Sequence, residues 1–279
     1  MPYSAEISRE NPSCFLFLLD QSYSMTDPIG GSESGESKEI ALAQAINRIL
    51  QELVIKCSKD MEVYRYFQIG IIGYGATVGP ALGGRLAGQP LVWIDEVYQN
   101  PLRVEEVTKK IPDGAGGLVE TTIKFPVWFD PVANNGTPMH QAFQQAYTIL
   151  QNWIADHPSS YPPIVINITD GASTDGDPSP IAAQIRELST DDGNALLLNL
   201  HLSASNAPSI TFSDGVEGLP DSYAELLFQM SSKLPESMRE TASEYGYRIS
   251  HDSRGFVFNA GIEDTIQFLN IGTRPSNLR

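Results

Sequence analysis

The sequence predicts an α/β protein with a Rossmann-like, doubly wound and mostly parallel sheet flanked by helices. Two observations support this fold class. Largely apolar runs such as "CFLFLL" and "IVINI" are typical of strands that are buried on both faces of a sheet. Segments with apolar residues at three- and four-residue steps, typical of amphipathic helices, separate these runs. Alternation of the two patterns along a chain indicates a parallel sheet covered by helices.

The first half of the chain shows this alternation in order. A strand is expected at 13–20, a helix at 37–57 and a second strand at 66–75. A helix is expected at 138–157, with Pro138 in its first turn, a position that suits proline.

The second half continues the pattern. Strands are expected at 162–170, 194–203 and 255–260, and helices at 179–189, 221–234, 236–246 and 262–270. The residues between 76 and 130 form short β-like runs divided by Gly and Pro, which favour a small β insertion. We therefore expect a single domain over 1–279, with a β-rich insertion at 76–130 and a helical C-terminal extension from about 204.

Composition excludes several classes of partner. The 34 acidic and 18 basic side chains give a formal net charge of −16, and nucleic acids and anionic membranes both favour clustered Lys and Arg. We expect neither as a partner. The N-terminal residues lack the pattern of a secretion signal and no apolar run approaches a membrane span, so we expect a cytoplasmic protein. Cys14 and Cys57 are expected to be buried structural thiols rather than a disulfide framework.

Oxygen-bearing side chains follow two of the expected strands. "DQSYS" places Asp20, Ser22 and Ser24 directly after the first strand, and Asp170 ends "IVINITD". Thr137 stands just before a helix. Because ligands bind beyond the carboxyl ends of strands in such sheets, we expect these five side chains to converge. All five donors are oxygens, and no histidine or lysine stands beside "DQSYS" to act as a general base, so the pattern favours a hard divalent cation such as Mg²⁺.

The same residues resemble a known family. "DQSYS" fits the D-x-S-x-S signature of von Willebrand factor A (vWA) domains, Gly136-Thr137 resembles their threonine loop, and 168–171 resembles their second acidic loop. Together these elements form the metal-ion-dependent adhesion site (MIDAS) of that family. The resemblance implies that Ser22, Ser24 and Thr137 bind the metal directly. It implies that Asp20 and Asp170 bind it directly or through water.

The resemblance also implies a function. It predicts a non-enzymatic, Mg²⁺-dependent module, with Mn²⁺ or Ca²⁺ as other possible ions, that binds an Asp or Glu of a protein partner. Within that family, the chain resembles bacterial intracellular vWA proteins of the tellurium-resistance and stress-associated type. Their association with AAA+ ATPases, or with phosphatases and kinases, implies such partners here. Tyr23 stands where the family usually has a small residue, and we expect it to narrow access to the ion.

Two alternatives remain open from sequence. A metal-dependent phosphohydrolase or phosphotransferase of similar fold also places an Asp after its first strand, but it needs a second Asp where this chain has Ser22. A scaffold with a vestigial site is the other alternative. Asp175 and Asp177 are expected to lie in a solvated loop that flanks the site.

Overall fold

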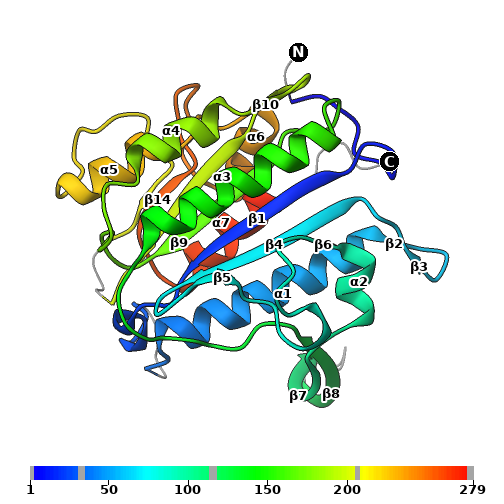
Figure 1. Ribbon diagram of the computed structural model, residues 1–279. Helices are drawn as coiled ribbons and strands as arrows, with labels where there is room; N and C mark the ends of the chain where they lie inside the picture. The colour runs from blue at the N-terminus through cyan, green and yellow to red at the C-terminus, as the bar shows by residue number, and fades with distance from the viewer. Residues whose placement is uncertain (1–2, 31–34, 113–117, 205–207, 275–279) are drawn as a thin grey trace.

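The computed structural model describes residues 3–30, 35–112, 118–204 and 208–274, and within them eight strands form a central sheet (Figure 1). Its order is β13-β14-β12-β9-β1-β4-β5, with β6 paired to β4. The strands are β1 (Ser13–Asp20), β4 (Phe67–Tyr74), β5 (Val78–Pro80), β6 (Val92–Trp93), β9 (Ile164–Thr169), β12 (Leu196–Leu202), β13 (Ile210–Thr211) and β14 (Phe256–Ala260). The five strands from β14 to β4 are parallel, and β5, β6 and β13 pair in antiparallel fashion. The predicted fold class is confirmed.

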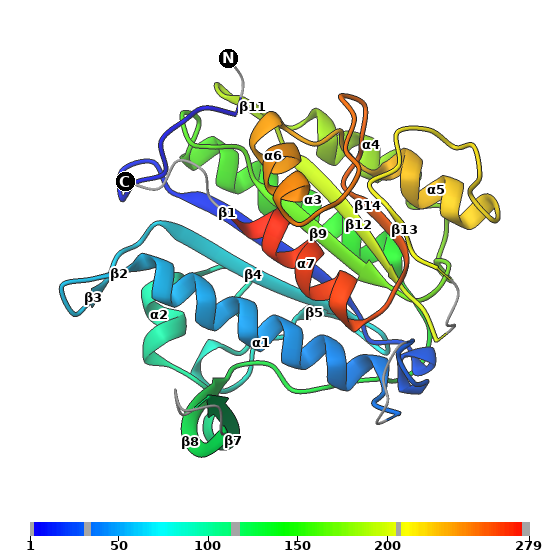
Figure 2. The same ribbon diagram turned by 180° about the vertical axis from the view of Figure 1, so that it is seen from behind.

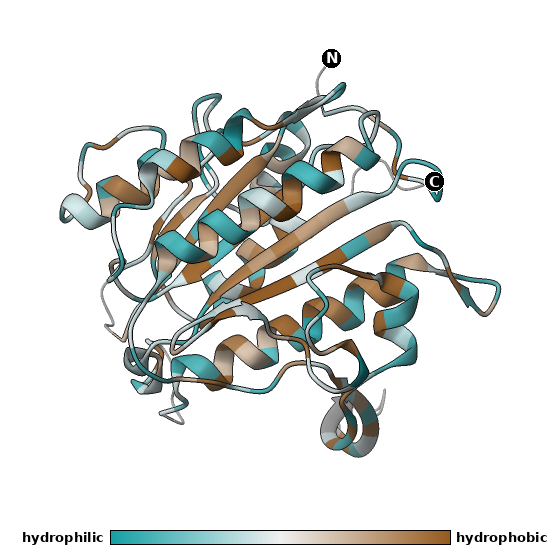
Figure 3. Cartoon of the chain, viewed as in Figure 1, coloured by the Kyte–Doolittle hydropathy of each residue, from teal (hydrophilic) through white to brown (hydrophobic). Residues whose placement is uncertain are grey.

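Helices cover both faces of this sheet. The helices are α1 (Lys38–Cys57), α2 (Ile94–Gln99), α3 (Met139–Asp156), α4 (Ser179–Glu187), α5 (Ser222–Met230), α6 (Glu236–Glu244) and α7 (Ile262–Thr273). Figure 1 shows α3, α4 and α5 on one face, and Figure 2 shows α1, α6 and α7 on the other. Figure 3 shows the apolar residues concentrated on the strands and on the helix sides that face them.

Strand β1 shows why burial on both faces needs a continuous apolar run. Phe15, Phe17 and Leu19 pack into the core beneath α1 and α7, whereas Leu16 and Leu18 pack into the core beneath α3 and α4. Successive side chains of a strand point to opposite faces, so a central strand is expected to be apolar at nearly every position. Both cysteines are buried and free, as expected.

The order of the strands determines where the carboxyl ends of β1 and β9 lie. From β1 the chain passes through α1 to β4 on one side, and later through α3 to β9 on the other side. The carboxyl ends of β1 and β9 therefore flank the point at which the direction of strand addition reverses. In open α/β sheets this switch point is where ligands bind.

The segment 76–130 contains more than short strands. It includes β5, the 3₁₀ turn η2 (Gly84–Leu86), β6 and α2, followed by a ribbon of β7 (Arg103–Pro112) and β8 (Leu118–Val127). Helix α2 was not expected. The ribbon, α1 and α7 line a groove of about 440 Å³. Two expectations about domain organisation stay predictions. The first is that this segment is a separate insertion, and the second is that a helical extension begins near 204.

Several short elements also escaped sequence analysis. They are the hairpins β2 (Ser58–Lys59) with β3 (Glu62–Val63) and β10 (Ser189–Thr190) with β11 (Gly193–Asn194), and the edge strand β13. Two-residue strands carry too little periodicity to be recognised. Pro138 also differs from expectation, because it occupies the N-cap of α3 and the helix begins at Met139.

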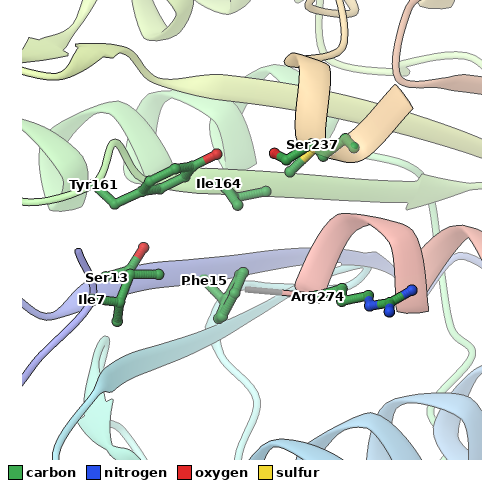
Figure 4. Close-up of a pocket in the computed structure, with 8 residues that line it drawn as sticks. Ile7, Ser13, Phe15, Tyr161, Ile164, Ser237 and Arg274 are labelled. Carbon is green, nitrogen blue, oxygen red and sulfur yellow. The ribbon is translucent and has the colours of Figure 1, made fainter. Parts of the chain in front are cut away.

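A small cavity lies at the opposite end of the sheet from the site, where β1 and β9 begin. Figure 4 shows that Ser13, Tyr161 and Ile164 line it beside Ser237 of α6 and Arg274. Its volume is about 10 Å³, which is about the size of one water molecule. It is too small to bind a substrate. Within the described part of the chain, no helix is long and apolar enough to cross a membrane.

Candidate metal site at the switch point

Four of the five predicted site residues come together at the carboxyl ends of β1 and β9. Asp20 is the last residue of β1, and Asp170 follows β9 directly. After Asp20 the chain turns into a short 3₁₀ helix, η1 (Tyr23–Thr26), which brings Ser22 and Ser24 back toward Asp170. Asp20 is 1% exposed, and the side chain of Asp170 is fully buried.

Hydrogen bonds connect these four residues. Ser24 Oγ donates to Asp170 Oδ1 at 2.8 Å, and Ser22 Oγ lies 3.0 Å from Ser24 Oγ. Ser22 Oγ is also 3.5 Å from Asp170 Oδ1. The backbone N–H of Ser22 donates to Asp20 Oδ1 at 2.8 Å. The two hydroxyls therefore converge on one carboxylate oxygen, and the turn itself holds the other carboxylate.

Thr137 reaches the same edge through its loop. The backbone N–H of Tyr23 donates to Asn135 O at 2.9 Å, which attaches the loop to the turn after β1. Thr137 is 5% exposed and lies just before α3. Among the described residues its hydroxyl makes no hydrogen bond to the other four side chains. A threonine hydroxyl has lone pairs that can serve an external ligand.

Lys38 is a site residue that sequence analysis missed. It is the first residue of α1 and is 4% exposed. Its Nζ lies 2.6 Å from Asp170 Oδ2, and 3.8 Å from Oδ2 of Asp27, whose side chain is 60% exposed. A lysine in the first helical turn lies at the unfavourable end of the helix dipole. This unfavourable placement of a lysine at a helix start was the only feature of the sequence that indicated a role for Lys38.

Thr169, which precedes Asp170, was not singled out either. Its Oγ1 donates to Asp20 Oδ2 at 2.7 Å. Burial raises the pKa of Asp20 to about 6, although hydrogen bonds from Ser22 and Thr169 act to lower it, and the nearby Asp170 adds to the rise. A buried carboxylate of this kind gains from a nearby positive charge.

Aromatic residues lie next to the second acidic loop (168–171), which includes Asp170. The hydroxyl of Tyr223 on α5 donates to Gly171 O and lies 3.5 Å from Thr169 Oγ1. His201 stacks on Phe258, with 4.1 Å between ring centroids. Burial lowers the pKa of His201 to about 4, so its imidazole is neutral at pH 7 and adds no charge to the site.

In the flanking loop, Asp175 makes contacts that the sequence did not reveal. Its carboxylate is half-buried and accepts hydrogen bonds from the backbone N–H groups of His140 and Gln141, each at 3.0 Å. Asp175 therefore satisfies free N–H groups at the start of α3 while it remains partly accessible to solvent. Asp177 is exposed, as expected, and its side chain accepts from the backbone N–H of Ser179. Tyr23 is 71% exposed, and its effect on access to the ion stays a prediction.

The donor set fits a hard divalent cation. It offers two carboxylates and three hydroxyls, all of them oxygen ligands of the kind that Mg²⁺ and Mn²⁺ accept. Within the described ranges no group of three His, Cys, Asp or Glu side chains could hold a metal. This absence is compatible with the proposed set, because only Asp20 and Asp170 are of those residue types. Their assignment as metal ligands stays a prediction.

Comparison with known proteins gives fold likenesses only. No protein-family model and no curated protein matches the chain. Among solved structures, manganese-loaded TRAP protein of Plasmodium vivax is 12% identical with a TM-score of 0.41, and the match covers 96% of this chain and 76% of that one. The ArnB paralog VWA2 of Sulfolobus acidocaldarius is 15% identical with a TM-score of 0.34, covering 70% and 35%.

Pilus tip proteins also match. The three N-terminal domains of the type V pili tip protein Mfa5 of Porphyromonas gingivalis are 13% identical with a TM-score of 0.33, and the match covers 58% of this chain. The chain spans only about a fifth of the length of that structure and of the pilus adhesin RrgA of Streptococcus pneumoniae.

Proposed function

We propose that this chain is a vWA domain that binds a divalent cation, Mg²⁺ in the cell, and through it a carboxylate of a protein partner. One observation carries the proposal: the hydroxyls of Ser22 and Ser24 converge on Asp170 Oδ1, beside Asp20, at the switch point of the sheet. The segments that supply these groups are far apart in sequence. Their convergence at the edge where α/β sheets bind ligands supports a site rather than chance loop contacts.

The proposal divides the site residues into those that bind the cation and those that orient the ligands. Ser22, Ser24 and Thr137 would hold the cation, with Asp20 and Asp170 bound directly or through water. The bound cation would supply a Lewis-acidic position open to an anionic ligand. The N–H of Ser22 and the hydroxyl of Thr169 keep Asp20 oriented, and such supporting hydrogen bonds are needed for metal affinity.

The proposed role is binding rather than catalysis. A phosphohydrolase of similar fold would need a second carboxylate two residues after Asp20, and that position is Ser22, whose hydroxyl lies beside that of Ser24. The partner would be a protein with an accessible Asp or Glu. An AAA+ ATPase, a phosphatase or a kinase in the cytoplasm of a bacterium is the partner that the family resemblance implies.

Titration with Mn²⁺, followed by the electron paramagnetic resonance of the free ion, tests the metal site. We expect one site in the wild-type protein, with Mg²⁺ competing for it. Removing both hydroxyls in S22A/S24A should weaken binding by about tenfold or more. The matched control D156N removes a carboxylate at the far end of α3 and should leave binding unchanged. Equal Mn²⁺ affinity for the double variant and the wild type would exclude the proposed ligands.

A second experiment tests the partner. Affinity capture from the native lysate is compared for wild type in Mg²⁺, wild type in EDTA, and D20A in Mg²⁺. Our proposal requires a protein that is retained only in the first sample and is released by free acetate. A protein that is retained equally in all three samples binds elsewhere on the chain. Metal-dependent hydrolysis of a phosphate ester, abolished in D20A, would instead support the enzyme.

A further inference from the structure

Lys38 and the two serines contact opposite oxygens of the same carboxylate. Asp170 Oδ1 accepts from Ser24 at 2.8 Å, whereas Oδ2 lies 2.6 Å from Lys38 Nζ. The side chains of Lys38 and Asp170 are 5% and 0% exposed. A cation held by the serine hydroxyls would therefore not require the Lys38–Asp170 ion pair to break.

Apart from its contact with Asp170, Lys38 lies in surroundings that are unfavourable for a positive charge. An ammonium group loses hydration energy on burial, and the first turn of a helix repels a positive charge. The exposed Asp27 adds only a distant interaction at 3.8 Å. Departures of this kind from local preferences are expected at functional sites. Asp170 is thus the contact that holds Lys38 in place.

The charges of the buried groups determine what the site can bind. When ionised, the carboxylates of Asp20 and Asp170 together with the ammonium of Lys38 carry one net negative charge. A divalent cation would change this total to one net positive charge. If residue 38 were neutral, the same cation would bring the site only to zero. Interactions between charges are strong where water is excluded, so this difference affects both the cation and any anion that follows it.

We propose that Lys38 lowers the affinity of this site for divalent cations and raises the affinity of the cation-loaded site for a carboxylate ligand. This inference rests on the proposed metal site. The positive charge of Lys38 weakens the binding of the metal and strengthens the binding of an anion to the metal-loaded site. Without metal, the same ammonium neutralises Asp170, so the empty site does not bury an unpaired carboxylate beside Asp20.

The test compares wild type, K38M and K38Q with the control K56M, which removes one positive charge at an exposed position in the last turn of α1. Mn²⁺ affinity is measured by electron paramagnetic resonance. One neutralised charge near the site should tighten Mn²⁺ binding by about tenfold or more in K38M. K56M should bind as the wild type does. If K38M does not fold, K38Q carries the same expectation, because its amide can still donate to Asp170.

A second readout uses acetate as the probe on the Mn²⁺-loaded proteins, through the relaxation rate of water protons. Acetate should bind several times more weakly to K38M or K38Q than to wild type. Without metal, K38M should melt at a lower temperature than wild type, and Mn²⁺ should raise its melting temperature by more.

The outcomes separate the two proposals. If the wild type, K38M and K38Q all bind Mn²⁺ with the same affinity, the proposed role of Lys38 is overturned and the proposed metal site is not. Unchanged acetate affinity in the loaded variants also overturns the proposed selectivity. Absence of Mn²⁺ binding in every variant overturns the metal site together with the role of Lys38. Binding by K38M and K38Q but not by the wild type would overturn the proposed function of the wild-type chain, although it would show that the charge of Lys38 opposes the metal.

Discussion

Thr169 and Asp20 lie side by side on β9 and β1, and the hydroxyl of Thr169 donates a 2.7 Å hydrogen bond to Asp20 Oδ2. Residues 19 and 168 are paired in the register of the two strands, so the next position on each strand falls at the edge of the sheet. The contact joins residues that are 149 positions apart in sequence. It orients a carboxylate that has almost no access to water.

Replacing Thr169 by Val should weaken Mn²⁺ binding. T169V keeps the shape of the side chain and removes the donor to Asp20, so the carboxylate loses orientation. The loss of a supporting hydrogen bond of this kind typically lowers metal affinity by about 10- to 100-fold. Mn²⁺ titration measures the effect, and T148V, which removes a hydroxyl bonded to Gln144 O on α3, is the control. An unchanged affinity in T169V would show that Asp20 does not need this contact.

Gly75 should not tolerate a side chain, because two loops approach it closely. A Cβ there would lie 2.6 Å from Gln21 O and 3.0 Å from Asn134 O. G75A must move the loop that carries Thr137, so it should lower stability by about 1–3 kcal/mol and weaken Mn²⁺ binding. Gly79 has no neighbour within 4 Å of the corresponding position. G79A should therefore change neither quantity, and equal behaviour of the two variants would contradict this account.

A buried polar chain crosses the sheet beneath the site, and Tyr74 begins it. Its hydroxyl donates to Asn167 Oδ1 at 2.8 Å, and Asn167 donates in turn to Asn199 Oδ1 at 3.0 Å. Y74F would leave Asn167 Oδ1 without that donor, which should lower the free energy of unfolding by about 1–3 kcal/mol. Urea denaturation measures this loss. Y98F alters a tyrosine that is 57% exposed, and it should shift stability by less than about 0.5 kcal/mol.

Asp175 should give a pH-dependent contribution to stability. Partial burial acts to raise its pKa, but hydrogen bonds from Gln141, Ser173 and His140 outweigh burial and hold the pKa below its usual value of 3.8. A carboxyl with a depressed pKa stabilises the fold above the unfolded pKa. That stabilisation is lost as the pH falls through the folded pKa. D175N should therefore cost about 1 kcal/mol at pH 7 and less near pH 3, which lies below the usual pKa of 3.8.

The control for Asp175 lies at the other end of α3. D156N removes the same charge from the last residue of the helix, where neutralising an acid is mildly favourable. Urea denaturation of both variants at the two pH values separates capping from a general charge effect. A loss of stability in D175N that is equally large at both pH values would rule out the carboxylate as its source.

Most long elements were predictable because their signals are local. The apolar run of β1 and the periodicity of α1 show in a few neighbouring residues, and the structure places both elements at the expected positions. Helix α2 was missed because its six residues are too few to show a helical period among short β-like runs. The contacts of Asp175 with the start of α3 could not be predicted, since nothing near it in sequence reveals the helix start that it contacts.

The sequence by itself determined the fold class and the hydroxyl and carboxylate groups that could converge at one edge. It did so because strand burial, helix periodicity and the position of polar residues at strand ends are properties of short segments. Only the tertiary structure decided which groups surround them. Lys38 contacts Asp170 across 132 residues, and Thr169 contacts Asp20 only because β1 and β9 are neighbours in the sheet. Charge balance at a buried site depends on such distant contacts, because Coulomb interactions follow distance in space and not separation along the chain.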